Sequence, residues 1–306
     1  MNIKMPRLSV VIVTYNRYKD LKECLDSLFN IADKPYETIV VDSCSTDGTE
    51  KVKDHYPIKF ISIQEKNRQK ARNVGVSVAR GNVVAFLDDD VVIDRNWSKY
   101  LNKPYEDSRV GGVGGRVVTY GKPKESYTDV KNRVVGKVFD NGLVLGNFDL
   151  PLPYSTEVDC LIGCNMSFRR DLLLKAGGFD ENFKGNCFRD DTDACLRVRK
   201  LGYKLMYQPK ALVWHKFKGK AVNPQWVYWY TRNNTYFYFK NIFTQSRLQL
   251  AFFFYRMLLP PRDYVLKSAI RVKLKATTLA LALKGILDGI NVYRANRLDF
   301  TQRERV

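Results

Sequence analysis

Three consecutive carboxylates, Asp88, Asp89 and Asp90, are the residues whose type and spacing point most directly to chemistry. They follow at once on the apolar run VVAFL. Like charges this close repel and raise one another's pKa unless a cation joins them. Divalent cations are held in proteins by one or two carboxylates together with substrate phosphates. The cluster therefore predicts a divalent-cation site, and a solvated turn after a strand is the alternative.

A second group of acids, Asp190, Asp191 and Asp193, opens a helical pattern over residues 190–201. Acids in a first turn suit the helix macrodipole, so capping alone is one interpretation. Residues at this spacing cannot all face the same way, so one carboxylate can point into a cleft while another caps. A carboxylate placed in a cleft can serve as a general base.

Further polar residues lie near the ends of apolar runs. His215 follows the strand-like run ALVW, and imidazole is a common metal ligand, although a half-buried histidine without a role is the alternative. Arg72 and Asn73 lie on a helical pattern, from which Arg72 can meet phosphate or a carboxylate. Asp42 ends an apolar run and can accept a hydrogen bond from a base or a ribose, unless it only forms a turn.

The elements that must position these residues are visible in the first third of the chain. A helical pattern with Leu21, Cys24 and Leu25 on one face, and another over 67–79, separate apolar runs typical of buried strands. Strands alternating with helices predict an α/β fold with a parallel sheet and helices on both faces. Ligands bind such sheets beyond the carboxyl ends of the strands, where the residues above lie. The four predicted strands are 8–13, 37–41, 58–63 and 82–87.

The middle of the chain is less regular. We expect a glycine-rich strand at 110–120, loops with short strands over 121–157, and a strand at 158–162. A short helix is expected at 171–176, stopped by two glycines, before the helix that opens with the second group of acids. The two short strands expected last are 204–207 and 211–214.

The C-terminal part of the chain is strongly basic. The formal net charge is +19, and residues 216–306 hold 17 Lys and Arg against 4 Asp and Glu. Such a tail fits phosphates, either of lipid headgroups or of nucleic acid. Helices are predicted at 224–243, 246–259 and 264–290, and the last carries a basic stripe. The stripe consists of Lys267, Arg271 and Lys275.

Composition excludes several classes of protein. The chain has 306 residues, 45% hydrophobic and 27% charged, which excludes a disordered, collagen-like or coiled-coil protein. The absence of an apolar run of about 18 residues predicts no conventional spanning helix, and the N-terminus shows no secretory h-region. Six cysteines without a C-x-x-C pair predict reduced thiols rather than a disulfide framework or a zinc finger.

Seven motifs in order resemble a family 2 glycosyltransferase: LSVVIVTYNR, VDSCSTDGT, ARNVG, VVAFLDDD, GCNMSFRRDLLLKAGGFDE, DDTDACLRVRKLGY and LVWH. The resemblance covers about residues 7–216. It implies the A-type nucleotide-sugar-binding fold, with a mixed, mostly parallel sheet and helices on both faces, followed by a C-terminal helical region. Residues 1–216 would form the catalytic domain, and residues 217–306 a basic, aromatic-rich helical region.

The resemblance also implies roles for individual residues. Asp191 would be the general base, within an Asp190-Asp191-Thr192-Asp193 run where the family commonly has Glu-Asp-x-Asp. Asp for Glu at the first place shortens the reach but keeps the charge. Asp90 and His215 would bind Mn²⁺ or Mg²⁺. Gly163, Asn165 and Asp190 would shape the acceptor side. The nucleotide-sugar donor would be bound by Thr14, Tyr15, Asn16, Asp42, Arg72, Asn73, Asp88 and Asp89.

The implied reaction is inverting transfer of a hexosyl or hexosaminyl group from a nucleotide-diphosphate sugar to a lipid-linked or polysaccharide acceptor. Aromatic residues at 226–239 and the basic tail predict a cytoplasmic enzyme, peripheral on the inner face of the cell membrane. The alternative is that these helices pack on the catalytic domain or pair two protomers. A nucleotidyltransferase and a nucleic-acid-binding protein are the rivals, but the second gives the acids no purpose, so no nucleic-acid partner is expected.

Overall fold

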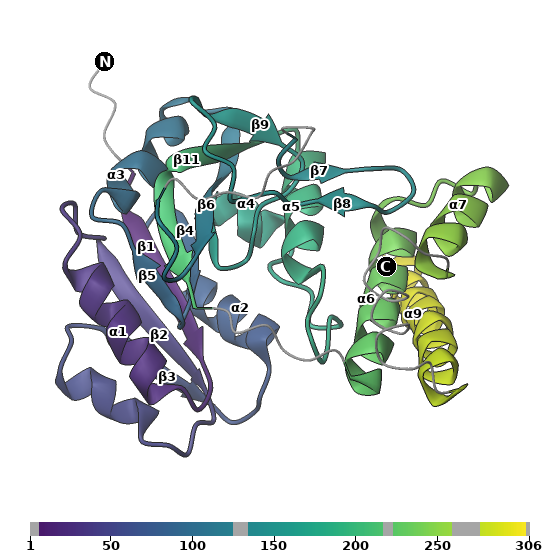
Figure 1. Cartoon of the computed structure of the whole chain (residues 1–306), viewed down its shortest axis with the longest axis horizontal. Coiled ribbons are helices and arrows are strands. Elements are labelled where there is room, and N and C mark those ends of the chain that lie inside the picture. The colour runs from purple at the N-terminus through teal and green to yellow at the C-terminus, as the bar shows by residue number, and fades with distance from the viewer. Residues whose placement is uncertain (1–5, 125–133, 217–222, 259–275, 304–306) are drawn as a thin grey trace. The chain divides into compact units, whose positions relative to one another are not determined.

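The computed structural model describes residues 6–124, 134–216, 223–258 and 276–303 (Figure 1). The chain forms two compact units, which are described separately below. The first unit comprises Met1–Lys137, Leu145–Asp180 and Ala194–Lys218. The second comprises Val138–Val144, Glu181–Asp193 and Gly219–Val306, so the acids of the 190–193 run belong to the same unit as the C-terminal helices.

The described part of the first unit is built on a nine-stranded sheet in the order β3-β2-β1-β4-β10-β6-β11-β5, with β9 paired to β11. The four strands predicted from the N-terminal apolar runs are mutually parallel. They are β1 (Leu8–Thr14), β2 (Glu37–Ser43), β3 (Lys59–Ile63) and β4 (Val83–Asp88). The predicted mixed, mostly parallel α/β fold is confirmed.

The other half of the sheet mixes strand directions. β10 is antiparallel to both β4 and β6, whereas β11 is parallel to β6 and antiparallel to β5 and β9. These strands are β5 (Val91–Ile93), β6 (Val110–Thr119), β9 (Thr156–Val158), β10 (Asn165–Arg169) and β11 (Lys204–His215). A separate pair consists of β7 (Lys137–Val138) and β8 (Val144–Leu145).

Helices α1 and α2 cover opposite faces of the parallel strands. Because successive side chains of a strand point to opposite faces, residues of β1 pack alternately on one helix and on the other. Val10 and Ile12 of β1 share a core with Leu21 and other residues of α1. The intervening Val11 faces α2, where a Cβ on Gly75 would lie 2.4 Å from it. The helices, including the 3₁₀ helices η1 and η2, are α1 (Tyr18–Phe29), η1 (Thr49–Asp54), α2 (Arg68–Val78), α3 (Trp97–Asn102), η2 (Lys103–Glu106), α4 (Arg170–Lys175) and α5 (Asp190–Lys200).

Two sequence-based strand predictions differ from the structure. The strand predicted at 158–162 is wrong, because β9 ends at Val158 and the amides of Asp159 and Cys160 donate instead to the Gly136 carbonyl at 2.7 and 3.1 Å. That apolar run reflects burial rather than ladder pairing. The two strands predicted at 204–207 and 211–214 form one strand, β11, whose register shifts between Gln208 and Leu212. The proline between them has no N–H to give the ladder, which accounts for the irregularity.

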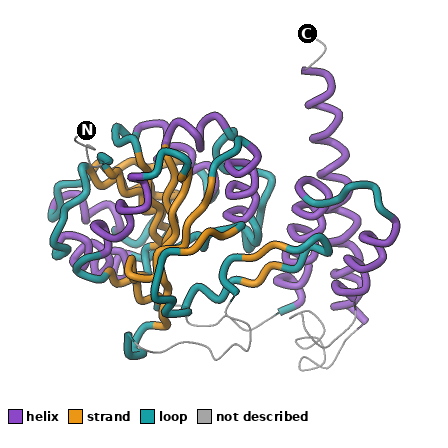
Figure 2. The backbone as a smooth tube through the Cα atoms, turned by 90° about the horizontal axis from the view of Figure 1, so that it is seen from above, coloured by secondary structure: helices purple, strands orange, loops and turns teal. Residues whose placement is uncertain are grey.

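The second unit is built from α6 (Pro224–Asn241), α7 (Arg247–Leu258) and α9 (Ala276–Arg303). The rings of Tyr238 in α6 and Phe253 in α7 stack with centroids 4.0 Å apart. Figure 2 shows the last turns of α9 extending beyond the other helices of this unit. None of the helices within the described ranges is long and apolar enough to cross a bilayer.

The helix predicted at 264–290 ends too early, because α9 continues to Arg303, and the first part of that prediction, residues 264–275, lies outside the described residues. The residues of the predicted basic stripe, Lys267, Arg271 and Lys275, lie outside the described residues.

Two glycines let α9 approach the backbone of α6. A Cβ on Gly289 would lie 2.5 Å from the carbonyl oxygen of Arg232 and 2.8 Å from the Cβ of Thr235. A Cβ on Gly285 would lie 2.5 Å from the carbonyl oxygen of Tyr228. Since backbone atoms cannot move aside as a side-chain end can, these positions require the absence of a side chain.

Gly289→Ala is therefore expected to destabilise the protein by about 1–3 kcal/mol, the usual cost of overpacking. The sign is diagnostic, because Gly→Ala at an uncrowded helix position stabilises by roughly 1 kcal/mol. Urea unfolding measures the difference, and Ala280→Leu, on an exposed position of the same helix, is the control. A Gly289→Ala protein as stable as the wild type would show that the helices do not pack this closely.

Candidate active site

Polar side chains meet at the carboxyl edge of the parallel strands. Thr14 of β1 pairs in register with Asp42 of β2, and Val13 pairs with Asp88 of β4. Thr14 and Asp42 are buried, and Asp42 accepts hydrogen bonds from the Ser45 amide at 3.0 Å and from a second serine, on β3. The structure thus brings together the strand-end residues that the sequence singled out.

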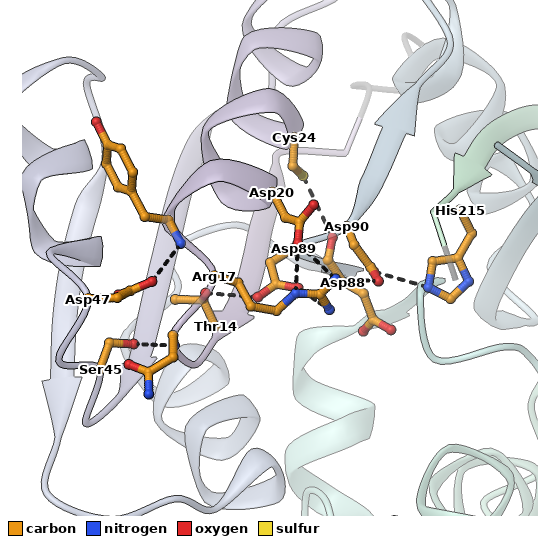
Figure 3. A network of polar contacts seen from close by, with 12 residues as sticks. Thr14, Arg17, Asp20, Cys24, Ser45, Asp47, Asp88, Asp89, Asp90 and His215 are labelled. Atoms are coloured by element: carbon orange, nitrogen blue, oxygen red, sulfur yellow. Dashed lines mark hydrogen bonds and ion pairs between the residues drawn. The ribbon is translucent and has the colours of Figure 1, made fainter. Parts of the chain in front are cut away.

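An arginine pairs with two acids of the acidic run. Arg17 lies 3.2 Å from an oxygen of Asp89 and 2.9 Å from one of Asp90, and it also pairs with Asp20 (Figure 3). Thr14 donates its hydroxyl to Asp89 at 2.8 Å. The sequence-based reasoning did not assign a role to Arg17, although this residue ends the TYNR run. Because Arg17 lies between a predicted strand and a predicted helix, the sequence did not indicate which acids its guanidinium would contact.

Asp90 and His215 come together through strand pairing. β11 runs antiparallel to β5, so His215 lies opposite Val91 in the ladder, and its Nε2 is 3.0 Å from Oδ1 of Asp90 (Figure 3). Burial favours the neutral imidazole, but hydrogen bonds to Asp90 and Cys164 outweigh it and raise the pKa of His215. Burial likewise opposes ionisation of Asp90, yet His215 and Arg17 hold its pKa below the ordinary value.

The donor atoms present here fit a divalent cation. Asp88, Cys164 and His215 each offer one ligand atom, and these atoms lie within 4.8 Å of one another. Asp90 adds a carboxylate oxygen beside the imidazole. Carboxylate oxygens suit Mg²⁺ and Mn²⁺, and an imidazole nitrogen favours Mn²⁺ of the two. The sequence analysis interpreted Cys164 only as a reduced thiol, because the spacing of the cysteines does not show which side chains surround it.

Asp89 supplies a pH-dependent test of this site. Burial raises the pKa of Asp89 from 3.8 to about 7, against the opposing effects of Arg17 and Thr14. The folded protein therefore holds this proton more tightly than the unfolded chain does, so this carboxyl makes folding less favourable as pH rises from about 4 to about 7. Asp89→Asn, which stays neutral, is expected to unfold at a higher temperature than the wild type at about pH 8.

The advantage of Asp89→Asn should shrink towards about pH 5, where the native carboxyl is also neutral. Thermal unfolding in the presence of EDTA at several pH values measures this. Asp20→Asn is the matched control, since it removes another partner of Arg17 that is 38% exposed. A difference between Asp89→Asn and the wild type that is constant over this pH range would contradict the raised pKa.

The loops after β1 and β2 are tied to each other. Asn16 adopts a positive φ of 50°. Its side-chain oxygen accepts a hydrogen bond from the backbone amide of Thr46 at 2.7 Å, and its backbone amide donates to the hydroxyl of Ser45 at 2.8 Å. The ammonium group of Lys66 lies 4.0 Å from the centroid of the Tyr15 ring. The segment in which we expect nucleotide contacts is thus held in one conformation by its neighbour.

Arg72 and Asn73 lie on α2 at the same edge of the sheet. Arg72 is buried, donates to the carbonyl of Gly163 at 3.1 Å, and lies 3.5 Å from a carboxylate oxygen of Asp88. Asn73 uses both ends of its amide on the backbone of Phe179, at 2.9 and 2.7 Å. Arg72 therefore adjoins the acidic run, and the role of Asn73 in donor binding stays a prediction.

Asn165, predicted to shape the acceptor side, is fully buried in β10. Its amide accepts from the indole N–H of Trp97 at 2.8 Å and donates to the carbonyls of Arg116 and Ala211 at 3.1 and 2.9 Å. These bonds join four segments of the first unit. Any acceptor contact by Asn165 stays a prediction.

The second group of acids begins α5, and its carboxylates point in different directions, as the spacing predicted. Asp190 is buried and accepts the amide of Asp191 at 2.8 Å, while Asp191 is partly exposed and accepts the amide of Thr192 at 2.6 Å. Asp193 is fully buried and paired with Lys240 at 2.9 Å. Asp191 is the acid of this group with solvent access.

Comparisons with known proteins show which family the chain belongs to. The chain is 28% identical over 236 residues to the glucosyl-dolichyl phosphate glucuronosyltransferase of Haloferax volcanii, covering 72% of both chains. It is 31% identical over 217 residues to the pre-mycofactocin glycosyltransferase of Mycobacterium tuberculosis, covering 68% of this chain but only 42% of that longer protein.

Among solved structures, the mannosyltransferase PcManGT from Pyrobaculum calidifontis, in complex with GDP-Man and Mn²⁺, superposes with a TM-score of 0.57. It shares 17% identity, and the match covers 95% of this chain and 88% of that one, so it supports the fold alone. Residues 9–177 match Glycosyl transferase family 2. This match spans more than half of the chain, and the protein therefore belongs to glycosyl transferase family 2.

Proposed function

We propose that this protein is an inverting, metal-dependent glycosyltransferase. In this proposal a hexosyl or hexosaminyl group passes from a nucleotide-diphosphate sugar to a hydroxyl of a lipid-linked or polysaccharide glycan. The observation that carries the proposal is the convergence of Asp88 at the end of β4, Asp90 in the turn that follows it and His215 at the end of β11, at the carboxyl edge of the sheet. The glucuronosyltransferase relative reported above, whose name gives glucosyl-dolichyl phosphate as its substrate, supports a lipid-linked acceptor.

Each group has a distinct part in the reaction. Asp90 and His215, with Asp88 beside them, would hold Mn²⁺ or Mg²⁺, which would neutralise the charge of the departing diphosphate. Asp191 takes the proton of the acceptor hydroxyl, and the acceptor oxygen forms a bond to the anomeric carbon from the side opposite the diphosphate. The bond to the diphosphate breaks in the same step. The anomeric configuration is inverted, and the proton ends on Asp191.

The donor is proposed to bind along the strand ends of the first unit. Thr14, Tyr15, Asn16 and Asp42 would surround the nucleotide, and the residues proposed to adjoin its sugar and phosphates come from α2 and from the end of β4 and the turn after it. They are Arg72, Asn73, Asp88 and Asp89. Gly163, Asn165 and Asp190 are proposed for the acceptor side. In this scheme residues 1–216 perform the transfer, and residues 217–306 form the helical region.

The nucleotide product distinguishes glycosyl transfer from nucleotidyl transfer, which also uses paired acids and a metal. Glycosyl transfer releases a nucleoside diphosphate from the sugar nucleotide, whereas nucleotidyl transfer releases pyrophosphate from a nucleoside triphosphate and a sugar phosphate. We expect the full chain with Mn²⁺ to release UDP or GDP from a UDP- or GDP-sugar. Pyrophosphate release from a triphosphate, without release of diphosphate from any sugar nucleotide, would overturn the proposal.

The second unit presents apolar faces that fit a membrane surface. Leu279, Leu283 and Leu287 recur every four residues along α9 and are 46–61% exposed, which places them on one face of the helix. α7 exposes three large side chains at similar spacing. The net charge of +13 over residues 216–306 would attract anionic lipid headgroups while the apolar residues enter the interface. The exposed residues of α7 are Leu248, Phe252 and Tyr255.

Flotation with anionic lipid vesicles tests this surface. We expect the wild-type chain to float with vesicles of phosphatidylcholine and phosphatidylserine, and Leu283→Asp/Leu287→Asp to lose about 90% of that binding. Thr277→Asp/Asn291→Asp adds the same charge at exposed polar positions of α9 and should keep most of the binding.

Equal flotation of wild type and the leucine double variant would contradict the assignment of this surface. Sedimentation velocity covers the remaining alternative, a homo-oligomer. A wild-type dimer that becomes a monomer in the leucine double variant, with no vesicle binding by either protein, would show that the leucine face pairs two copies. We propose that the enzyme, when it is docked through this surface, works at the inner face of the cell membrane.

A further inference from the structure

The segment that leads to Asp191 has an unusual backbone. In the second unit, Gly185, Cys187 and Arg189 adopt positive φ angles of 67°, 54° and 77°. Glycine accepts such a conformation without cost, but residues with a side chain do so only where their surroundings hold them. Cys187 and Arg189, both within three residues of Asp190, therefore require an external support for this conformation.

Helix α6 supplies part of that support. Asn233 is fully buried and donates its side-chain amide to the carbonyl oxygen of Lys184 at 2.8 Å and to the Asn186 side chain at 3.1 Å. Arg232 donates to the carbonyl oxygen of Asn182 and, at 2.8 Å, to the side chain of Asn233. Adjacent side chains of α6 thus satisfy carbonyl groups on the segment around Gly185.

The strained arginine is fixed to the same helix. Arg189 donates from Nε to the side-chain oxygen of Asn234 at 3.1 Å, and its guanidinium lies 4.5 Å from the centroid of the Phe188 ring. Asn234 is buried and donates in turn to the carbonyl of Tyr230 at 2.8 Å. Arg189, which has the largest positive φ among these residues, is therefore held by a hydrogen bond to a buried asparagine.

A third contact fixes the start of α5. The carboxylate of Asp193, which has no exposed surface, lies 2.9 Å from the ammonium group of Lys240 and accepts from Asn241 at 2.8 Å. Lys240 and Asn241 follow Asn233 by seven and eight residues, so the three lie on one side of α6. A buried carboxylate needs such partners, because unpaired burial of a charge is costly.

We propose that this polar face of α6, formed by Arg232, Asn233, Asn234, Lys240 and Asn241, positions the carboxylate of Asp191. The inference rests on the proposed role of Asp191 as the base. The helix contacts residues on both sides of Asp191, from Asn182 to Asp193, and a base displaced by about 1 Å can lose two orders of magnitude in rate. These five residues of α6 therefore act as positioning residues for Asp191, while the helix also packs with α7 and α9.

The test compares Asn233→Ala with a matched control in the full chain. With Mn²⁺ and a UDP- or GDP-sugar as the probe, release of UDP or GDP gives kcat and the donor KM. We expect Asn233→Ala to lower kcat at least about tenfold and to change the donor KM less than about twofold. Gln225→Ala, on the exposed side of the same helix, should leave both unchanged. Hydrogen exchange should quicken in peptides of residues 181–193 and stay constant in β1 and β4.

A double-mutant cycle separates positioning from general destabilisation. In an Asp191→Asn background, Asn233→Ala is expected to cause no further loss of kcat, because the group that it positions is already absent. If Asn233→Ala does not fold, Asn234→Ser replaces it in the same cycle. An equal loss in both backgrounds, or an unchanged kcat despite faster exchange, would overturn the positioning role. Full turnover by Asp191→Asn alone would instead refute the proposed base, and this inference with it.

Discussion

Asp191→Asn is expected to lower kcat by roughly 10²–10⁴-fold while donor binding is kept. The substitution removes the group that takes the acceptor proton, but an asparagine oxygen can still accept from the Thr192 amide, as the carboxylate does at 2.6 Å. The residues proposed to bind the donor lie in the first unit and are untouched. Initial rates of diphosphate release, together with calorimetric titration of the donor, measure the two quantities separately.

Asp190→Asn is the matched comparison for this prediction. Asp190 is buried beside Asp191, holds its amide at 2.8 Å and stands where the family commonly has Glu. We expect a smaller loss of kcat for Asp190→Asn than for Asp191→Asn. The reverse order would move the base to Asp190, and full activity of both variants would remove the base from this run altogether.

Asp90→Asn is expected to lower kcat/KM by roughly 10²-fold or more and to weaken the apparent affinity for Mn²⁺. Asp90 offers the carboxylate that lies 3.0 Å from His215, and an uncharged amide is a much poorer ligand for a hard cation. The lost carboxylate also leaves Arg17 and His215 without one partner each. Activity measured against Mn²⁺ concentration separates a weaker cation site from a slower reaction.

Asp20→Asn controls for the effect on Arg17, because Asp20 pairs with the same guanidinium at 3.0 Å but offers no ligand beside His215. It should retain the wild-type dependence on Mn²⁺. If Asp90→Asn keeps this dependence as well, the cation is held elsewhere. If both variants lose activity in parallel, Arg17 rather than the cation site explains the effect.

Much of the parallel sheet was predictable, because its strands are continuous apolar runs and local patterning decides them. Strands β1 to β4 were predicted within one or two residues of their observed ends. The run 165–169, which forms β10, was not predicted as a strand, since its alternation of polar and apolar residues rests on only two apolar side chains, Met166 and Phe168. Its place between β4 and β6 depends on pairing across more than fifty residues, which local sequence does not express.

The candidate site was predictable to a similar degree. The carboxyl edge of a parallel sheet placed Asp42 and the acids of β4 together without any knowledge of side-chain contacts. The family resemblance placed His215 with Asp90 at one cation, but local patterning did not, because their contact depends on the register between β11 and β5, and β5 is too short to stand out. Arg17 is a single basic residue whose partners became visible only in three dimensions.

The contacts of α6 lay beyond what periodicity can show. Its central residues, including Asn233 and Asn234, are polar and buried, whereas a helical pattern predicts that polar residues face solvent. Their partners are carbonyl and side-chain groups of a segment 45–49 residues earlier. The role of such a buried polar face can be recognised only when the structure shows which segment it contacts.

Binding of sugar nucleotides to the wild type and to Asp90→Ala tests the central claim most directly. Thermal unfolding would be followed with UDP-, GDP-, CMP- and dTDP-sugars, each with and without Mn²⁺ or Mg²⁺. A ligand at one hundred times its Kd stabilises the folded state by about 2.7 kcal/mol. We predict stabilisation by sugars of one nucleotide, only with the cation, and its loss in Asp90→Ala. Stabilisation that needs no cation and persists in Asp90→Ala, or none with any donor, would contradict a metal-assisted donor site at the carboxyl edge of the sheet.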